Sequence, residues 1–175
     1  MIDPRKFKAP YIPKERIWQE ADQLRIAHPA GRSLSVKVLD LAEFDLHLDL
    51  VPVNGLREQL DIDALLMGDL KSILVDKRAF MSPRLEYRLR FSVAHEIGDL
   101  IPAYEFAGRL LVPPDALREA FQTAVQTAQA AGYSDWLAAD EAALDYIATR
   151  IAPKFGVSVE VIAKRLRVEK LWPPA

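Results

Sequence analysis

The segment from Arg90 to Asp99, with the sequence RFSVAHEIGD, holds the side chains whose types and spacing best fit metal chemistry. His95 and Glu96 match the first two positions of the pattern H-E-x-x-H. In that pattern, two histidines four residues apart hold a metal ion from one helical face, and the glutamate acts as general base on a metal-bound water. Asp99 stands where the second histidine would be. Because one histidine does not make a metal site, the pattern predicts half of a metallopeptidase centre.

Asp99 has two possible roles in such a centre. It lies four residues after His95, so its carboxylate could face the same metal, and carboxylate oxygen is an acceptable zinc ligand. It could instead be an ordinary carboxylate at a helix end, which is the interpretation we favour. Glu105 is close in sequence but falls on the next element. A site with one imidazole and two or three oxygens would be weak and poorly selective, so we expect the chain to bind zinc weakly or not at all.

A central helix is needed to position His95 and Glu96. Apolar residues at four-residue spacing predict this helix over 86–97, with Phe91 and Val93 or Ile97 buried in the core. The apolar stripe consists of Leu85, Leu89, Val93 and Ile97. Three arginines, Arg84, Arg88 and Arg90, are predicted to lie on its solvated face rather than in a nucleic-acid patch, since acidic residues interrupt them.

The remaining elements predict an α+β fold, in which a small sheet of about three strands packs on a mainly helical body. Residues 62–67 and 73–75 flank a polar connection and are typical of a hairpin. A helix is expected over 14–27, whereas 36–50 fits either a helix or a strand. Later helices are predicted over 103–112 and 116–131, after Asp140 and after Ser158, with Asp115, Asp140 and Ser158 as N-caps.

The chain is predicted to form one domain over 1–175, with an extended N-terminal arm over 1–15 and a C-terminal helical segment over 141–172. Around Gly156 that segment has the spacing of a helix-turn-helix, in which Lys164, Arg165 and Arg167 could contact phosphates. The competing interpretation is a glycine turn that joins two packed helices. The net charge of −2 makes nucleic acid an unlikely partner, so DNA binding is kept only as the alternative.

Composition excludes several other classes. The chain has 175 residues, of which 50% are apolar and 27% charged, as in ordinary globular proteins. It has no cysteine, which excludes disulfides, thiolate zinc sites and a cysteine nucleophile, and fits a cytoplasmic protein. No apolar run is long enough for a signal peptide or a membrane span. The other two histidines, His28 and His47, are predicted to be surface residues.

Three segments resemble the ImmA/IrrE-type metallo-endopeptidases, and together with the hairpin the similarity spans roughly 12–172. Tyr87 to Gly98, YRLRFSVAHEIG, is similar to the family signature R-x-R-F-[ST]-x-A-H-E-x-G-H up to its last residue. Phe106 to Pro113, FAGRLLVP, resembles the family's F-A-x-x-L-L-x-P helix. Phe155 to Ser158, FGVS, with the residues that follow it, is similar to the family's closing segment.

The resemblance implies a bacterial, cytoplasmic zinc peptidase that cleaves a helix-turn-helix repressor, often encoded by a neighbouring gene, and so relieves repression. It makes His95 a zinc ligand and Glu96 the general base. The family's second histidine falls on Asp99, and its acidic third ligand falls near Leu100 or Ile101, whose side chains cannot bind metal.

The junction between Gly98 and Ala103 is short for this family. A ligand helix must continue past its second ligand, yet Pro102 disfavours helical geometry at Ile101. Three explanations of the short junction are open: loss of the segment in a natural pseudo-enzyme, an engineered deletion, and a segment that is missing from the sequence. The sequences on both sides match the family closely, which favours a missing segment. A non-catalytic regulatory protein that binds a repressor, or DNA, remains the alternative function.

Overall fold

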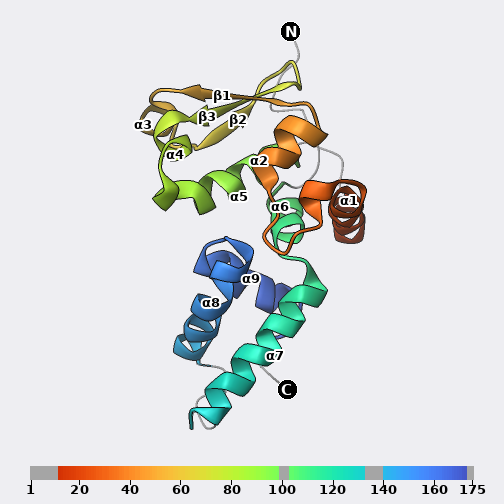
Figure 1. Ribbon diagram of the computed structural model, residues 1–175, viewed down its shortest axis with the longest axis vertical. Coiled ribbons are helices and arrows are strands. Elements are labelled where there is room, and N and C mark those ends of the chain that lie inside the picture. The colour runs from red at the N-terminus through yellow and green to blue at the C-terminus, as the bar shows by residue number, and fades with distance from the viewer. Residues whose placement is uncertain (1–11, 99–102, 133–139, 173–175) are drawn as a thin grey trace.

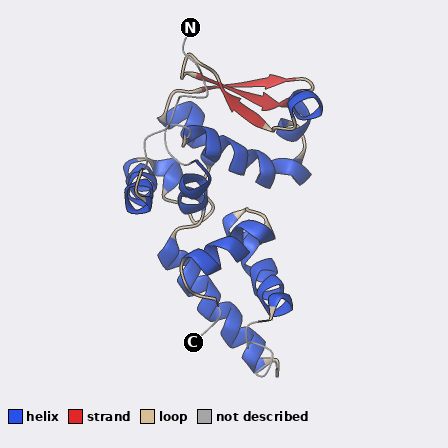
Figure 2. Cartoon of the chain, turned by 180° about the vertical axis from the view of Figure 1, so that it is seen from behind, coloured by secondary structure: helices blue, strands red, loops and turns tan. Residues whose placement is uncertain are grey.

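The computed structural model describes residues 12–98, 103–132 and 140–172, and it confirms the α+β class (Figure 1). A three-stranded sheet lies at one end, with α5 along one of its faces, and α7, α8 and α9 form the other end (Figures 1 and 2). The elements are α1 Lys14–Ala27, η2 Pro29–Gly31, α2 Val38–Asp40, η3 Leu41–Asp45, β1 Asp49–Val53, α3 Leu56–Leu60, β2 Ala64–Leu66, β3 Ser72–Asp76, α4 Lys77–Phe80, η4 Pro83–Leu85, α5 Glu86–Ile97, α6 Ala103–Leu111, α7 Pro114–Ala130, α8 Glu141–Phe155 and α9 Val159–Val168.

The sheet has the strand order β1-β3-β2. The predicted hairpin is confirmed, because β2 pairs antiparallel with β3 and Leu65 lies opposite Leu74. The Asp69 carboxylate accepts hydrogen bonds from the backbone N–H groups of Lys71 and Ser72 and so fixes the tip of the hairpin. β1 pairs parallel with β3, so the ambiguous segment 36–50 divides into α2, the π-helical turn η3 and the start of a strand.

The predicted central helix is confirmed as α5. Leu89 and Val93 are fully buried against the sheet and neighbouring helices, while Phe91 and Ile97 are half-buried. Gly98 follows the last residue of α5, and a Cβ there would lie 2.6 Å from Cδ1 of Phe106 on α6. The side chain of Phe106 therefore packs directly against the end of α5. This contact leaves no space for a side chain at position 98, so only glycine fits there.

The solvated-arginine prediction is wrong for Arg90, which is only 7% exposed. Its guanidinium donates hydrogen bonds to the carbonyl oxygens of Gly156 and Val36 at 2.7 Å each, and to that of Phe155 at 3.3 Å. Arg84 is exposed, as predicted. The α8–α9 turn leaves carbonyl groups without helical partners, and the buried arginine satisfies them. Arg90 thereby joins α5 to the C-terminal helices.

Two of the three predicted caps are confirmed. The Asp140 carboxylate accepts from the N–H of Ala142, and the Ser158 hydroxyl accepts from that of Val161. The prediction that Asp115 caps α7 is wrong, since the helix begins at Pro114, two residues earlier than predicted, and Asp115 lies within its first turn. Proline fits there because the first helical N–H needs no intrahelical acceptor. The Asp115 charge still interacts favourably with the helix dipole.

Candidate functional site

Glu96 lies at the C-terminal end of α5, directly against the sheet. Its side chain is 8% exposed, and its Oε2 accepts a hydrogen bond from the backbone N–H of Leu66 at 2.7 Å. Leu66 belongs to β2, which among the described strands has a neighbour on one side only. The carboxylate is therefore fixed at the outer edge of the sheet. The helix and the hairpin bring together two groups thirty residues apart in sequence.

His95 is half-buried and lines a hollow of about 250 Å³ next to this edge. Phe91, Ser92 and Glu96 of α5 also line this hollow. Its opposite wall consists of residues 61–64, which lead into β2, and of Arg57. The spacing of 91, 92, 95 and 96 places all four on one helical face, so Phe91, which was predicted to lie in the core, is only half-buried and lines the hollow instead. The described residues thus keep His95 and Glu96 together, in a solvent-reaching hollow beside an edge strand.

The described residues do not by themselves fit a zinc ion. Among them, no group of three histidine, aspartate or glutamate side chains lies within metal-binding reach. Asp99, with Leu100 and Ile101, lies outside the described residues. Glu105 lies on α6, where it pairs with Lys14 at 3.7 Å. One imidazole and a carboxylate held by a backbone N–H do not complete a tetrahedral site.

The expected weak zinc binding therefore remains a prediction. After dialysis against a metal-free buffer at neutral pH, elemental analysis of the purified protein is expected to find well under one zinc per chain, because a single protein imidazole binds zinc weakly. His95→Ala is the matched control and should change the zinc content little. A stoichiometric zinc that is lost in His95→Ala would contradict the prediction.

The other histidines take no part in this site. His28 lies at the end of α1, with its Nδ1 3.8 Å from Oδ1 of Asp45. His47 is exposed, as predicted, and lies just before β1 in a left-handed conformation with φ of 56°. Neither residue lines the hollow that contains His95.

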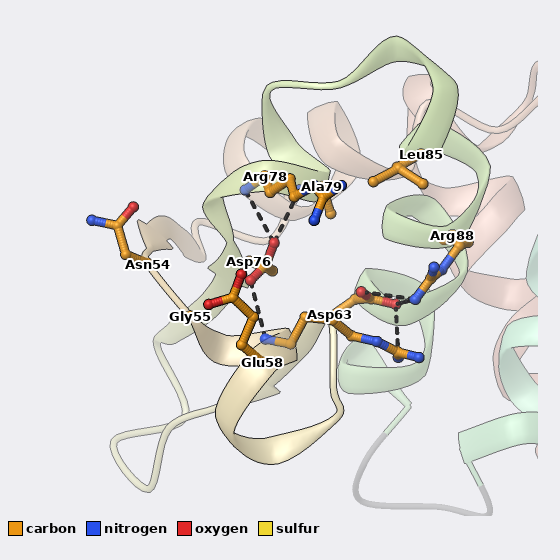
Figure 3. Close-up of a pocket in the computed structure, with 10 residues that line it drawn as sticks. Asn54, Gly55, Glu58, Asp63, Asp76, Arg78, Ala79, Leu85 and Arg88 are labelled. Carbon is orange, nitrogen blue, oxygen red and sulfur yellow. Dashed lines mark hydrogen bonds and ion pairs between the residues drawn. The ribbon is translucent and has the colours of Figure 1, made fainter.

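A second, charged hollow of about 390 Å³ adjoins the first (Figure 3). Arg57 and Asp63 line both hollows. Arg88 donates to both carboxylate oxygens of Asp63, at 2.8 and 3.1 Å, and Arg57 lies 3.7 Å from the same carboxylate. Arg57 and Asp63 were not singled out from the sequence, and Arg88 was predicted only to lie on a solvated helix face, because α3, the approach to β2 and α5 meet only in the folded chain. Their charges are largely compensated within the hollow.

Asp76, at the end of β3, supports this wall. Its carboxylate accepts from the backbone N–H groups of Arg57, Arg78 and Ala79, at 3.1, 3.0 and 3.1 Å (Figure 3). Burial alone would raise the pKa of Asp76, but the three hydrogen bonds favour the charged form and the net effect is a lowered pKa. Asp76 therefore caps α4 and ties the start of α3 to the sheet.

Asp76→Asn is expected to lower the free energy of unfolding by about 1–2 kcal/mol at pH 7, because the amide cannot accept on both sides. A carboxyl group with a lowered pKa stabilises the fold above its unfolded pKa and loses that contribution as the pH falls through its folded pKa. The difference between wild type and variant should therefore shrink as the pH falls below about 4. Urea unfolding at pH 7, 5 and 3 measures it, and a difference independent of pH would contradict the assignment.

Only two of the three candidate phosphate contacts on α9, Lys164 and Arg167, are exposed. Lys164 is exposed and lies over the ring of Tyr104, with its Nζ 3.4 Å from the ring centroid. Arg165 is only 3% exposed and pairs with Glu169, while Arg167 pairs with Glu141. In this conformation Arg165 is not accessible to a phosphate. The glycine turn and the packed helices fit the structural interpretation of the segment.

Searches of family models, curated proteins and solved structures find no match to this chain. Among the described residues, no helix combines the length and apolar character that a membrane crossing requires.

Proposed function

We propose that this chain is a zinc metallo-endopeptidase-like protein of the bacterial cytoplasm that acts on a helix-turn-helix transcriptional repressor. One observation carries the proposal: α5 places His95 and Glu96 side by side at the outer edge of β2, in a hollow that a polypeptide segment can reach. The sequence resemblance supplies the reaction class and the repressor as substrate. By that resemblance Glu96 is the general base and His95 a metal ligand.

The edge strand supports an extended polypeptide as the bound species. Peptides commonly bind by adding a strand to the edge of a sheet, where main-chain hydrogen bonds give affinity and side-chain hollows give selectivity. Leu66 on β2 holds Glu96 at that edge. A segment that lay along β2 would therefore pass the candidate general base. An exposed loop of a repressor can supply such a segment.

Hydrolysis needs metal ligands beyond those that the described residues provide. The proposal is therefore linked to the inferred missing segment between Gly98 and Ala103. The chain has a mass of 19.7 kDa. An intact mass of the natural protein well above this value would support a missing segment, and an equal mass would favour the non-catalytic alternative.

Glu96→Gln tests the catalytic assignment. The purified protein is incubated with zinc and with the repressor encoded beside its gene, and cleavage is followed by mass spectrometry. Glu96→Gln is expected to reduce cleavage by at least about 100-fold, as for loss of a general base. The glutamine oxygen can still accept from the Leu66 N–H, so repressor binding and melting temperature should change little.

Glu86→Gln is the matched control, because Glu86 is an exposed residue at the opposite end of α5. Equal cleavage by wild type and Glu96→Gln would exclude the general-base role. Repressor binding without cleavage by wild type would select the non-catalytic regulatory alternative. If the repressor neither binds nor is cleaved, the proposed partner is wrong.

A further inference from the structure

Glu96 lies between two hollows of opposite character. On one side is the hollow that contains His95, with the charged residues Arg57, Asp61 and Asp63 in its wall. On the other side is an apolar hollow of about 390 Å³, between α1, the approach to β1, the β2–β3 hairpin, the end of α5 and α6. Its apolar lining consists of Leu24, Leu46, Leu48, Leu66, Leu70, Ile97 and Phe106.

The lining defines the chemistry that the apolar hollow accepts. Glu20 and Glu96 are its only charged residues among the described lining, and neither is a cation. Leu48, Leu66 and Ile97 are half-buried, so part of their apolar surface still faces solvent. An acidic group would be repelled, whereas an aliphatic side chain would bury apolar surface on both partners. The volume lies within the roughly 300–1,000 Å³ typical of ligand pockets.

Leu70 provides an independent observation. It is 55% exposed at the tip of the hairpin and has φ of 56°, a left-handed conformation. That conformation costs an L-residue with an ordinary side chain roughly 1–2 kcal/mol, and glycine or asparagine adopts it more readily. The Asp69 hydrogen bonds to Lys71 and Ser72 hold the turn in place. A large apolar residue is thus strained and exposed at the rim of the hollow, which indicates a contact with another molecule.

We propose that the apolar hollow receives a large aliphatic side chain of the polypeptide that binds along the edge of β2, with Leu70 forming the rim of this subsite. The identity of that polypeptide rests on the proposed function. Side chains of an extended segment alternate in direction about every 3.3 Å. Both hollows are lined by α5, so a segment that crosses Glu96 directs one aliphatic side chain into the apolar hollow and a polar side chain two residues away toward Arg57 and Asp63.

The test uses the full chain labelled with ¹³C at its leucine methyl groups. The probes are two acetylated and amidated octapeptides of serine and glycine, one with leucine and one with alanine at a central position. Saturable shifts are expected for the methyl signals of Leu70 and Leu48 with the leucine peptide, and at least about tenfold weaker binding is expected for the alanine peptide. The methyl signals of Leu60, which is 58% exposed on α3, should not move.

Three variants complete the test in peptide and repressor binding. Leu70→Asn keeps the left-handed backbone and removes the rim, and Leu48→Phe fills the hollow from another wall; each should weaken binding about tenfold. Leu60→Asn removes a similarly exposed leucine that lines neither hollow, and should have no effect.

Equal repressor binding by all variants would overturn the subsite and leave the proposed function standing. Selective leucine-peptide binding without repressor binding would support the subsite and overturn the repressor as partner. Equal binding of both peptides, or movement of Leu60, would overturn the subsite.

Discussion

Replacing Arg90 with methionine is expected to lower the free energy of unfolding by about 3–5 kcal/mol, since hydrogen bonds to charged groups contribute about 1.5–3 kcal/mol each and are not fully additive. Methionine keeps much of the side-chain volume but donates no hydrogen bond. The carbonyl oxygens of Gly156, Val36 and Phe155 would lose their charged donor in a buried setting. Burial lowers the pKa of Arg90, against the opposing effect of Glu86, yet an arginine remains cationic at neutral pH.

Urea unfolding followed by circular dichroism measures this loss. Arg84→Met is the matched control, because Arg84 is exposed in the turn before α5 and should tolerate the change within about 0.5 kcal/mol. Equal midpoints for the two variants would show that the hydrogen bonds of Arg90 contribute nothing to stability. Arg90 connects α5 to the C-terminal helices. As urea is raised, the variant should therefore lose its near-ultraviolet dichroism, which reports tertiary packing, at a lower concentration than its far-ultraviolet dichroism, which reports helix.

Gly156→Ala is expected to cost a similar amount, about 3–5 kcal/mol, through two effects that act together. Gly156 has φ of 61°, which costs an alanine roughly 1–2 kcal/mol. Its added Cβ would also lie 1.7 Å from Nη1 of Arg90, so the guanidinium would have to leave its carbonyl partners. The turn between α8 and α9 is thus limited to glycine both by its backbone and by its neighbour.

Gly132→Ala separates these two effects. Gly132 has φ of 87°, but a Cβ there would meet nothing within 4 Å, so only the backbone term applies and a loss of about 1–2 kcal/mol is expected. The double variant Arg90→Met with Gly156→Ala should lose clearly less than the sum of the single variants, because both disrupt the same contact. Additive losses would show that the collision is relieved without displacing Arg90.

Local pattern was sufficient for much of the fold. The four-residue spacing from Leu85 to Ile97 predicts α5 with correct bounds, because a helix places such residues on one face whatever lies opposite. The β2–β3 hairpin and the caps at Asp140 and Ser158 depend on short-range geometry in the same way. The sequence also determined that His95 and Glu96 share one helix end.

The surroundings of these residues depend on the tertiary structure. Arg90 resembles a surface residue in sequence, and the carbonyl groups that pair with it in the core come from distant segments, namely Val36 and the α8–α9 turn. Glu96 likewise meets its backbone donor through the position of the hairpin. Helical periodicity specifies which face a side chain occupies, but not which buried donor or acceptor lies opposite that face. That partner depends on long-range packing, because an unsatisfied polar group from a distant segment must be paired wherever it becomes buried.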